Sequence, residues 1–178
     1  PLPHLAKPAK RIITLAPHLT ELVYSGGAGD AIVGVGRYSN YPADALKKPI
    51  VGDAFSLNLE SIIKLKPDLV LAWQGGSRPA DLARLRQLGI VVWEVQIDKL
   101  ADVPHTLEQL GVLTGRVSQA TQQAAQFKAR LNKLKQTRKT PPKVFLQIGQ
   151  NPLYTIGKSQ ILHEVIHLCG GRNVFAHL

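Results

Sequence analysis

The residue best placed to bind a ligand is Trp73, which follows an unbroken apolar run over residues 69–72 and precedes Gly75-Gly76. A run of this kind is typical of a parallel strand that is buried on both faces. Open α/β sheets bind their ligands at the carboxyl ends of such strands. The pattern therefore predicts an aromatic ligand platform at Trp73, with a core position as the alternative. For Trp93, which lies inside a strand pattern, the core position is the preferred interpretation.

Histidines offer two further places for chemistry. His18 follows the first predicted strand and could coordinate the metal of a ligand, but a solvent-facing loop histidine is the preferred interpretation. His163 and His167 are four residues apart on a predicted helix, a spacing that can hold a metal, yet no third ligand is evident. The sequence therefore predicts no metal site.

Catalytic signatures are not found in the sequence. It contains no G-x-S-x-G motif, no Walker loop and no paired catalytic carboxylates. The glycine-rich segment 26–29 follows a predicted helix, so it is not a phosphate loop of the usual strand-to-helix kind. We therefore predict that the protein is not an enzyme and needs no catalytic cofactor.

The charge of the 178 residues, +10 in total, is unevenly distributed. Residues 1–114 carry 12 basic and 11 acidic side chains, whereas residues 115–178 carry 10 basic side chains and one acidic side chain, Glu164. A basic half can bind nucleic acid or another anionic surface. The cluster over residues 128–143 lacks the interleaved aromatics of single-strand binders, so a solvated helix face is preferred.

The remaining composition narrows the class of protein. No stretch approaches the roughly 20 apolar residues of a membrane-spanning helix. The first residues lack the basic start and apolar centre of a signal peptide, which predicts a cytoplasmic or an already processed chain. The single cysteine, Cys169, excludes an internal disulfide in this sequence.

Strands and short helices alternate along the first half, which predicts a parallel α/β sheet. Strands are expected at residues 11–16, 32–35, 50–51, 69–72 and 91–95. Helices are expected at residues 20–24, 58–65 and 79–88, the second of them beginning at Asn58.

The second half predicts helices at residues 101–114 and 117–137, the latter with a single apolar stripe and Pro141-Pro142 after it. A strand at 143–148 and a helix at 161–168 then begin a second α/β unit. One strand and one helix are too few to bury a core alone. The predicted organisation is a first α/β lobe, a long helix and the start of a second lobe.

Several segments together resemble the helical-backbone class of substrate-binding proteins that serve ABC importers (class III periplasmic binding proteins). These are RIITLAPHLTEL, YSNYP, NLESIIKLKPDLVLAW, VFLQIG, NPLYTIGKSQIL and LCGGRNVF, in order over about residues 11–175. The first and third are similar across the class, including its siderophore and haem binders. The loops YSNYP and NPLYTIGK are most similar to its cobalamin-binding members.

The resemblance implies a fold of two α/β lobes joined by one long helix, with the ligand between the lobes. The N-terminal lobe would cover residues 1–114, the backbone linker helix 115–140 and the start of the C-terminal lobe 141–178. In the class the C-terminal lobe continues, so the chain resembles a truncated product, and Cys169 matches half of a disulfide whose partner would lie further on. A periplasmic location, with the signal peptide already removed, is also implied.

The resemblance further implies which residues contact cobalamin (vitamin B12). A corrin is a broad, mostly apolar plate with amide arms, and aromatic rings cover such a plate at low entropic cost. The aromatic contacts carried over are Tyr38, Trp73 and Tyr154, with Phe55 near the place of a second pocket tryptophan. Asn58 and backbone groups near Pro17 and Gly75 would serve the amides.

The partner implied is the membrane permease of an ABC importer, on which Glu60 would dock through arginines. A first-turn glutamate that complements the helix dipole is the alternative for Glu60. The predicted function is thus an extracytoplasmic binding protein that delivers cobalamin, with no nucleic acid as partner. The alternatives are a haem or iron-siderophore binder, an α/β enzyme acting on an anionic substrate at the basic second half, and a protein-interaction or nucleic-acid module that uses helix 117–137.

Overall fold

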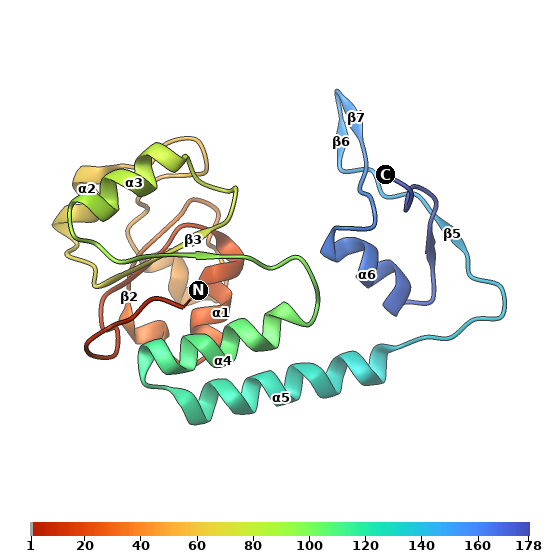
Figure 1. Ribbon diagram of the computed structural model, residues 1–178, viewed down its shortest axis with the longest axis horizontal. Coiled ribbons are helices and arrows are strands. Elements are labelled where there is room, and N and C mark those ends of the chain that lie inside the picture. Colours follow the sequence, from red (N-terminus) through yellow and green to blue (C-terminus); the bar gives the residue numbers. More distant parts are fainter. Residues whose placement is uncertain (1) are drawn as a thin grey trace. The chain divides into compact units, whose positions relative to one another are not determined.

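The computed structural model describes residues 2–178, and the chain divides into two compact units (Figure 1). The N-terminal unit contains the residues up to Gln96 together with Thr106–Gln123. The C-terminal unit contains Ile97–His105 and Ala124–Leu178. Each unit has its own secondary structure and is described by itself.

A four-stranded parallel sheet forms the centre of the N-terminal unit. Its strands are β1 (Ile12–Thr14), β2 (Ile32–Val35), β3 (Leu69–Trp73) and β4 (Val92–Val95), in the order β2-β1-β3-β4. All three neighbouring pairs are parallel. The predicted α/β class with a parallel sheet is therefore confirmed, and the carboxyl ends of the strands lie at one edge.

Helices cover both faces of this sheet, with α2 and α3 on one face and α1 and α4 on the other (Figure 1). The helices in chain order are α1 (Pro17–Ser25), α2 (Leu59–Lys64), α3 (Pro79–Gln87), α4 (Asp102–Thr114) and α5 (Val117–Leu134). Two short 3-10 helices, η1 (Gly29–Ala31) and η2 (Ala43–Lys47), lie in the connections. The helical regions predicted from apolar periodicity are thus all present.

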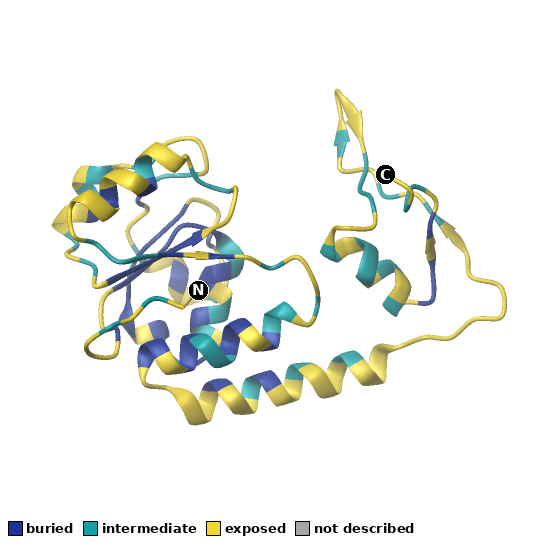
Figure 2. Cartoon of the chain, viewed as in Figure 1, coloured by how far each residue is buried: buried dark blue, intermediate teal, exposed yellow. Residues whose placement is uncertain are grey.

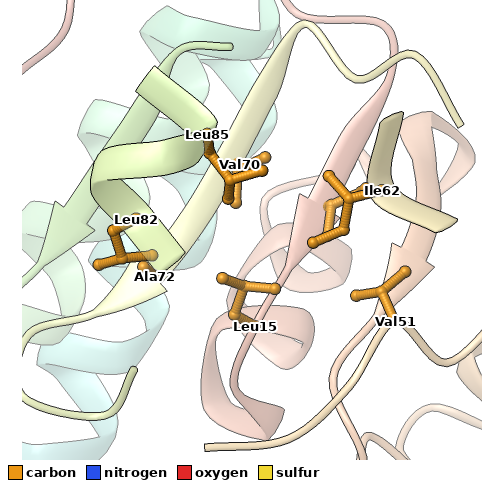
Figure 3. Close-up of a cluster of buried hydrophobic side chains, with 8 residues drawn as sticks. Leu15, Val51, Ile62, Val70, Ala72, Leu82 and Leu85 are labelled. Carbon is orange, nitrogen blue, oxygen red and sulfur yellow. The ribbon is translucent and has the colours of Figure 1, made fainter. Parts of the chain in front are cut away.

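Buried apolar side chains from β1, β3, α2 and α3, together with Leu15 and Val51 outside these elements, form one hydrophobic cluster (Figure 3). Its members are Ile13, Leu15, Val51, Ile62, Val70, Ala72, Leu82 and Leu85. Because β3 is covered on both faces, its first four residues are fully buried, as the unbroken apolar run predicts. On α4, the three predicted apolar positions Leu107, Leu110 and Leu113 are also buried.

Two local predictions for the N-terminal unit are wrong. Residues 50–51 do not form a strand, because only a single bridge joins Ile50 to Val35. Helix α1 begins at Pro17, three residues before the predicted start. Proline has no N–H and a fixed φ, so it suits the first helical position, where the N–H would have no partner within the helix.

The C-terminal unit contains α6 (Ile161–Leu168) and two small sheets. Strand β5 (Lys143–Val144) pairs in parallel with β8 (Arg172–Asn173), and β6 (Gly149–Gln150) forms a hairpin with β7 (Leu153–Tyr154). The predicted strand over residues 143–148 is therefore wrong in length, since only its first two residues belong to a strand. The carboxylate of Glu164 accepts a hydrogen bond from the Leu100 N–H over 2.6 Å, which ties residues 97–105 to α6.

Burial differs strongly between the two units (Figure 2). Dark blue, buried residues are concentrated in the sheet and helices of the N-terminal unit, whereas no residue of α6 is buried. Helix α5 is shorter than predicted, and its residues up to Gln123 belong to the N-terminal unit. The lobe boundaries predicted at residues 114 and 140 stay predictions. Within residues 2–178, no helix combines the length and the apolar character needed to cross a membrane.

Candidate functional site

The carboxyl edge of the sheet brings several predicted ligand contacts to one part of the N-terminal unit. Tyr38 follows β2, Pro17 and His18 follow β1, and Trp73 ends β3. These three strands are direct neighbours and run in parallel, so the segments that follow them emerge side by side. We call the four residues the carboxyl-edge surface.

Trp73 is not a core residue. Its side chain is 46% exposed, whereas Trp93 is 6% exposed and belongs to the core, as predicted. The ring of Trp73 makes an edge-to-face contact with the ring of His18, with 5.6 Å between the ring centroids and an interplanar angle of 90°. An exposed indole that is held on one side by a second ring is a suitable platform for an apolar plate.

The turn that follows β3 also packs against this indole. The N–H of Gly76 donates to the carbonyl oxygen of Trp73 over 2.9 Å, and Gly75 has a φ of +78°, which favours glycine. A Cβ atom at Gly76 would overlap Cε3 of the Trp73 ring and lie 3.0 Å from its Cδ2. The ring therefore needs a glycine at Gly76, a role that sequence analysis missed. The backbone role predicted for Gly75 stays a prediction.

His18 is partly buried beside Trp73. Burial lowers the pKa of its imidazole, so the neutral ring is favoured at neutral pH. Within residues 2–178, neither ring nitrogen of His18 has a hydrogen-bond partner in the protein. Every fully buried side-chain nitrogen or oxygen of these residues does have a partner. The ring nitrogens of His18 therefore reach the surface. The preferred interpretation of a loop histidine is wrong in one respect, because His18 lies on helix α1 with its ring half-buried against Trp73. A role in coordinating cobalt or iron stays a prediction.

Buried hydroxyl groups hold the segment that carries Tyr38. Thr20 Oγ1 lies 2.6 Å from Thr14 Oγ1 and 3.0 Å from Ser39 Oγ, and all three side chains are buried. This hydroxyl chain joins β1, α1 and the loop after β2. Next to it, Tyr38 has a left-handed φ of 70° and is 76% exposed. Its ring is thus presented to solvent by an ordered loop.

A polar network connects this loop to the loop that carries Phe55. Asp53 Oδ1 accepts hydrogen bonds from the Phe55 and Ser56 N–H groups, and Asp53 Oδ2 forms an ion pair with Arg37 Nε at 3.4 Å. The two backbone hydrogen bonds, followed by Arg37, lower the pKa of Asp53. Phe55 itself is 84% exposed, so it is available for contact.

Tyr154 lies in the C-terminal unit, on strand β7. Its ring lies over Gly149, its partner on β6, where a Cβ atom would overlap the ring. The surrounding groove has a volume of about 390 Å³ and is lined by Phe145, Leu153, Tyr154, Thr155 and Phe175. The rings of Phe145 and Phe175 meet edge to face at 5.7 Å. This unit therefore presents its own apolar aromatic surface.

Glu60 is exposed in the first turn of α2. Before it, Asn58 is the N-cap, and its Oδ1 accepts a hydrogen bond from the Ser61 N–H over 2.9 Å. That oxygen is therefore already used by the helix, which weakens the interpretation that Asn58 serves a ligand amide. Glu60 remains free to meet a partner protein or to complement the helix dipole.

The histidine pair on α6 has no third metal-ligating side chain beside it among the described residues. The rings of His163 and His167 are 4.5 Å apart, and His163 Nδ1 lies 3.4 Å from Asn173 Nδ2. In the part of the chain that the structure describes, no group of three or more His, Cys, Asp or Glu side chains is placed to hold a metal. Cys169 is exposed with a free thiol.

Comparisons with known proteins agree with this architecture. A vitamin B12-binding protein of Vibrio cholerae is 39% identical over 176 residues, which are 97% of this chain and 64% of that protein. The crystal structure of the periplasmic vitamin B12 binding protein BtuF of Vibrio cholerae matches with a TM-score of 0.85 and 38% identity, over 96% of this chain and 68% of that one. This chain thus spans 62–64% of the length of the curated relatives it matches.

A second solved structure is nearly as similar in fold. It is a possible iron-binding (periplasmic solute-binding) protein from Staphylococcus epidermidis, with 30% identity and a TM-score of 0.84 over 97% of this chain and 69% of that one. The family described as "Periplasmic binding protein" matches residues 12–178. This chain belongs to the periplasmic binding protein family.

Proposed function

We propose that this chain captures cobalamin in the periplasm and serves an ABC importer, without performing chemistry on its ligand. The observation that carries the proposal is the exposed Trp73 platform at the carboxyl edge of the sheet, with Tyr38 on the neighbouring loop. The Vibrio cholerae relatives, which are named for vitamin B12 binding, support the choice of ligand.

The chemistry of the ligand fits the surfaces that each unit presents. A corrin is large and mostly apolar on its faces, so it needs broad aromatic contacts and a few hydrogen-bonding groups. The N-terminal unit supplies Trp73, Tyr38 and Phe55, all of them exposed. The C-terminal unit supplies Tyr154 and the groove around it. Backbone groups near Pro17 and Gly75 are the proposed partners of the amide arms.

A binding experiment tests the ligand. We expect corrin absorbance to travel with the protein when the 178-residue chain is mixed with cyanocobalamin and separated by gel filtration. Trp73→Ala should greatly reduce this co-elution, whereas Leu88→Ala should not, although Leu88 is similarly exposed at 43%. Loss of binding in both variants, or in neither, would contradict the assignment of Trp73 as the platform.

The second candidate is haem or an iron-siderophore, supported by the match to a possible iron-binding protein. It is tested by the same gel filtration with haem or an iron(III) hydroxamate siderophore. If one of these co-elutes with the chain and cyanocobalamin does not, the cobalamin proposal is wrong.

The proposed partner is the membrane permease of the importer, with Glu60 as the docking group. Glu60→Gln keeps the shape of the side chain and removes its charge. It should leave cobalamin binding in solution unchanged and reduce cobalamin uptake by cells that depend on this protein. Glu21→Gln, at an exposed position on α1, is the control. Equal uptake by the two variants would rule out the docking role.

A further inference from the structure

We propose that the C-terminal unit binds the surface of an anionic phospholipid bilayer. The site is a group of six exposed cationic side chains on the end of α5, the connection after it, β5 and β8. We call it the basic surface, and its members are Lys133, Lys135, Arg138, Lys139, Lys143 and Arg172. The inference goes beyond the proposed function and does not depend on which small ligand the chain carries.

The six cations have no counter-ion within the protein. Among residues 2–178, none of their side chains forms an ion pair or a hydrogen bond with another residue. The one acidic side chain of residues 115–178, Glu164, already accepts the Leu100 N–H. Clusters of about four to eight Lys and Arg on amphipathic helices are typical of proteins that bind anionic lipid headgroups.

The connection between α5 and β5 is exposed but held to the rest of the unit (Figure 2). The Gln136 N–H donates to the carbonyl oxygen of Leu168 over 2.8 Å, and the Arg172 N–H donates to that of Pro142 over 2.9 Å. The cations of this connection are therefore presented by a hydrogen-bonded backbone. Less backbone entropy is then lost when the surface binds a partner.

Two of the cations are direct neighbours across a strand pair. Lys143 on β5 lies opposite Arg172 on β8 in the parallel register. Like charges in such positions repel each other and destabilise a sheet. An anionic surface that contacts both side chains would remove this repulsion, so the pair is better suited to a bound partner than to the isolated protein.

The apolar residues beside the cations favour a bilayer over nucleic acid. Residues 128–143 contain no aromatic side chain on which a base could stack. Instead, Leu131 and Leu134 share one face at the end of α5, where Leu131 is half-buried and Leu134 is 58% exposed. Basic amphipathic helices bury such leucines at the boundary between headgroups and acyl chains, whereas a phosphate backbone offers mainly charge.

Flotation of the 178-residue chain with lipid vesicles tests the proposal. We expect the chain to bind vesicles of phosphatidylglycerol mixed with phosphatidylcholine, and not vesicles of phosphatidylcholine alone. Binding should be present at about 0.1 M salt and lost at about 1 M, because the Debye length falls from about 10 Å to about 3 Å. The double variant Lys143→Gln, Arg172→Gln should bind roughly 30-fold more weakly, since each cation near an anionic surface contributes about fivefold.

Two further double variants accompany this test. Lys135→Gln with Lys139→Gln changes cations outside the strands and should cause the same loss, so the result does not depend on the β5–β8 pair. Lys64→Gln with Arg78→Gln removes the same charge from exposed positions of the N-terminal unit. This matched control should bind vesicles as wild type does.

Three results would overturn the proposal. The first is that wild-type protein fails to bind phosphatidylglycerol vesicles at the lower salt concentration, or binds phosphatidylcholine vesicles equally well. The second is an equal loss of binding in the control variant, which would assign the effect to net charge and not to the basic surface. The third is displacement of the protein from the vesicles by a DNA duplex at the same phosphate concentration, which would make nucleic acid the preferred partner.

Discussion

Replacing Gly76 by alanine tests whether the turn after β3 holds the Trp73 indole in place. The new Cβ atom would overlap Cε3 of the indole and lie 3.0 Å from Cδ2. These are atoms of a rigid ring, so the conflict is relieved only if the indole rotates away or the turn opens. Because Gly76 lies outside the hydrophobic cluster, we expect the folded unit to persist while the platform is displaced.

The size of the effect follows from the exposed part of the indole. A tryptophan can bury about 150–250 Å², and 46% of the Trp73 side chain is exposed. A ligand that covers this part removes on the order of 70–115 Å² of surface from water, which corresponds to about 2–3 kcal/mol. Gly76→Ala should therefore weaken cyanocobalamin binding by roughly 30- to 150-fold.

Isothermal titration of wild-type protein, Gly76→Ala, Trp73→Ala and the double variant with cyanocobalamin forms a complete cycle. If Gly76 acts only through the indole, its substitution should have little further effect once Trp73 is already alanine. An equal loss of affinity in both backgrounds would refute the reasoning, because it would show that Gly76 acts on the ligand or on the fold directly. Circular dichroism of each variant checks that the fold is retained.

Three further predictions concern the N-terminal unit. Asn58→Ala removes the side-chain acceptor for the Ser61 N–H and should lower the free energy of unfolding by about 1 kcal/mol. Urea denaturation measures this loss, and an unchanged midpoint would show that the cap does not stabilise the fold. Leu85→Ala, at a fully buried position, should lower the free energy of unfolding by about 2–5 kcal/mol in the same assay, and a loss below about 1 kcal/mol would contradict its place in the core. Burial, and then the hydrogen bond to Asp44, raise the pKa of Tyr24 from 10.0 to about 12. The stability that this shift contributes is present below pH 10 and is lost as the pH rises to about 12. Ultraviolet titration should show a phenol that ionises near pH 12 in wild type and is absent from Tyr24→Phe. Asp44→Ala should lower the pH at which this phenol ionises.

The parallel sheet was predictable because its signals are local. Residues 69–72 form an unbroken apolar run, and the sheet covers them on both sides. Residues 50–51 and 143–148 also carry strand signals, but they do not form full strands. Pairing depends on which strands the rest of the fold places beside a segment, and here a single bridge forms at Ile50 and only Lys143 and Val144 pair with β8. The β6–β7 hairpin was missed for the converse reason, because two-residue strands leave no period to detect.

The candidate site was predictable only in part. The pattern around Trp73 identifies the residue, because strand ends can be read from the sequence. The role of Gly76 and the contact of His18 with Trp73 depend on tertiary geometry that no spacing reveals. The same holds for the hydroxyl chain, whose members are separated by 6 and 19 residues.

That hydroxyl chain determines when the loop of Tyr38 becomes ordered. Its oxygens are buried, so they are joined as the unit folds and not as a ligand arrives. The loss of backbone entropy in this loop, about 1–2 kcal/mol per residue, therefore belongs to folding. Because this loop is ordered before the ligand arrives, the association rate of the ligand should not depend on loop ordering. Differences in affinity between ligands should then appear mainly as differences in how long each stays bound.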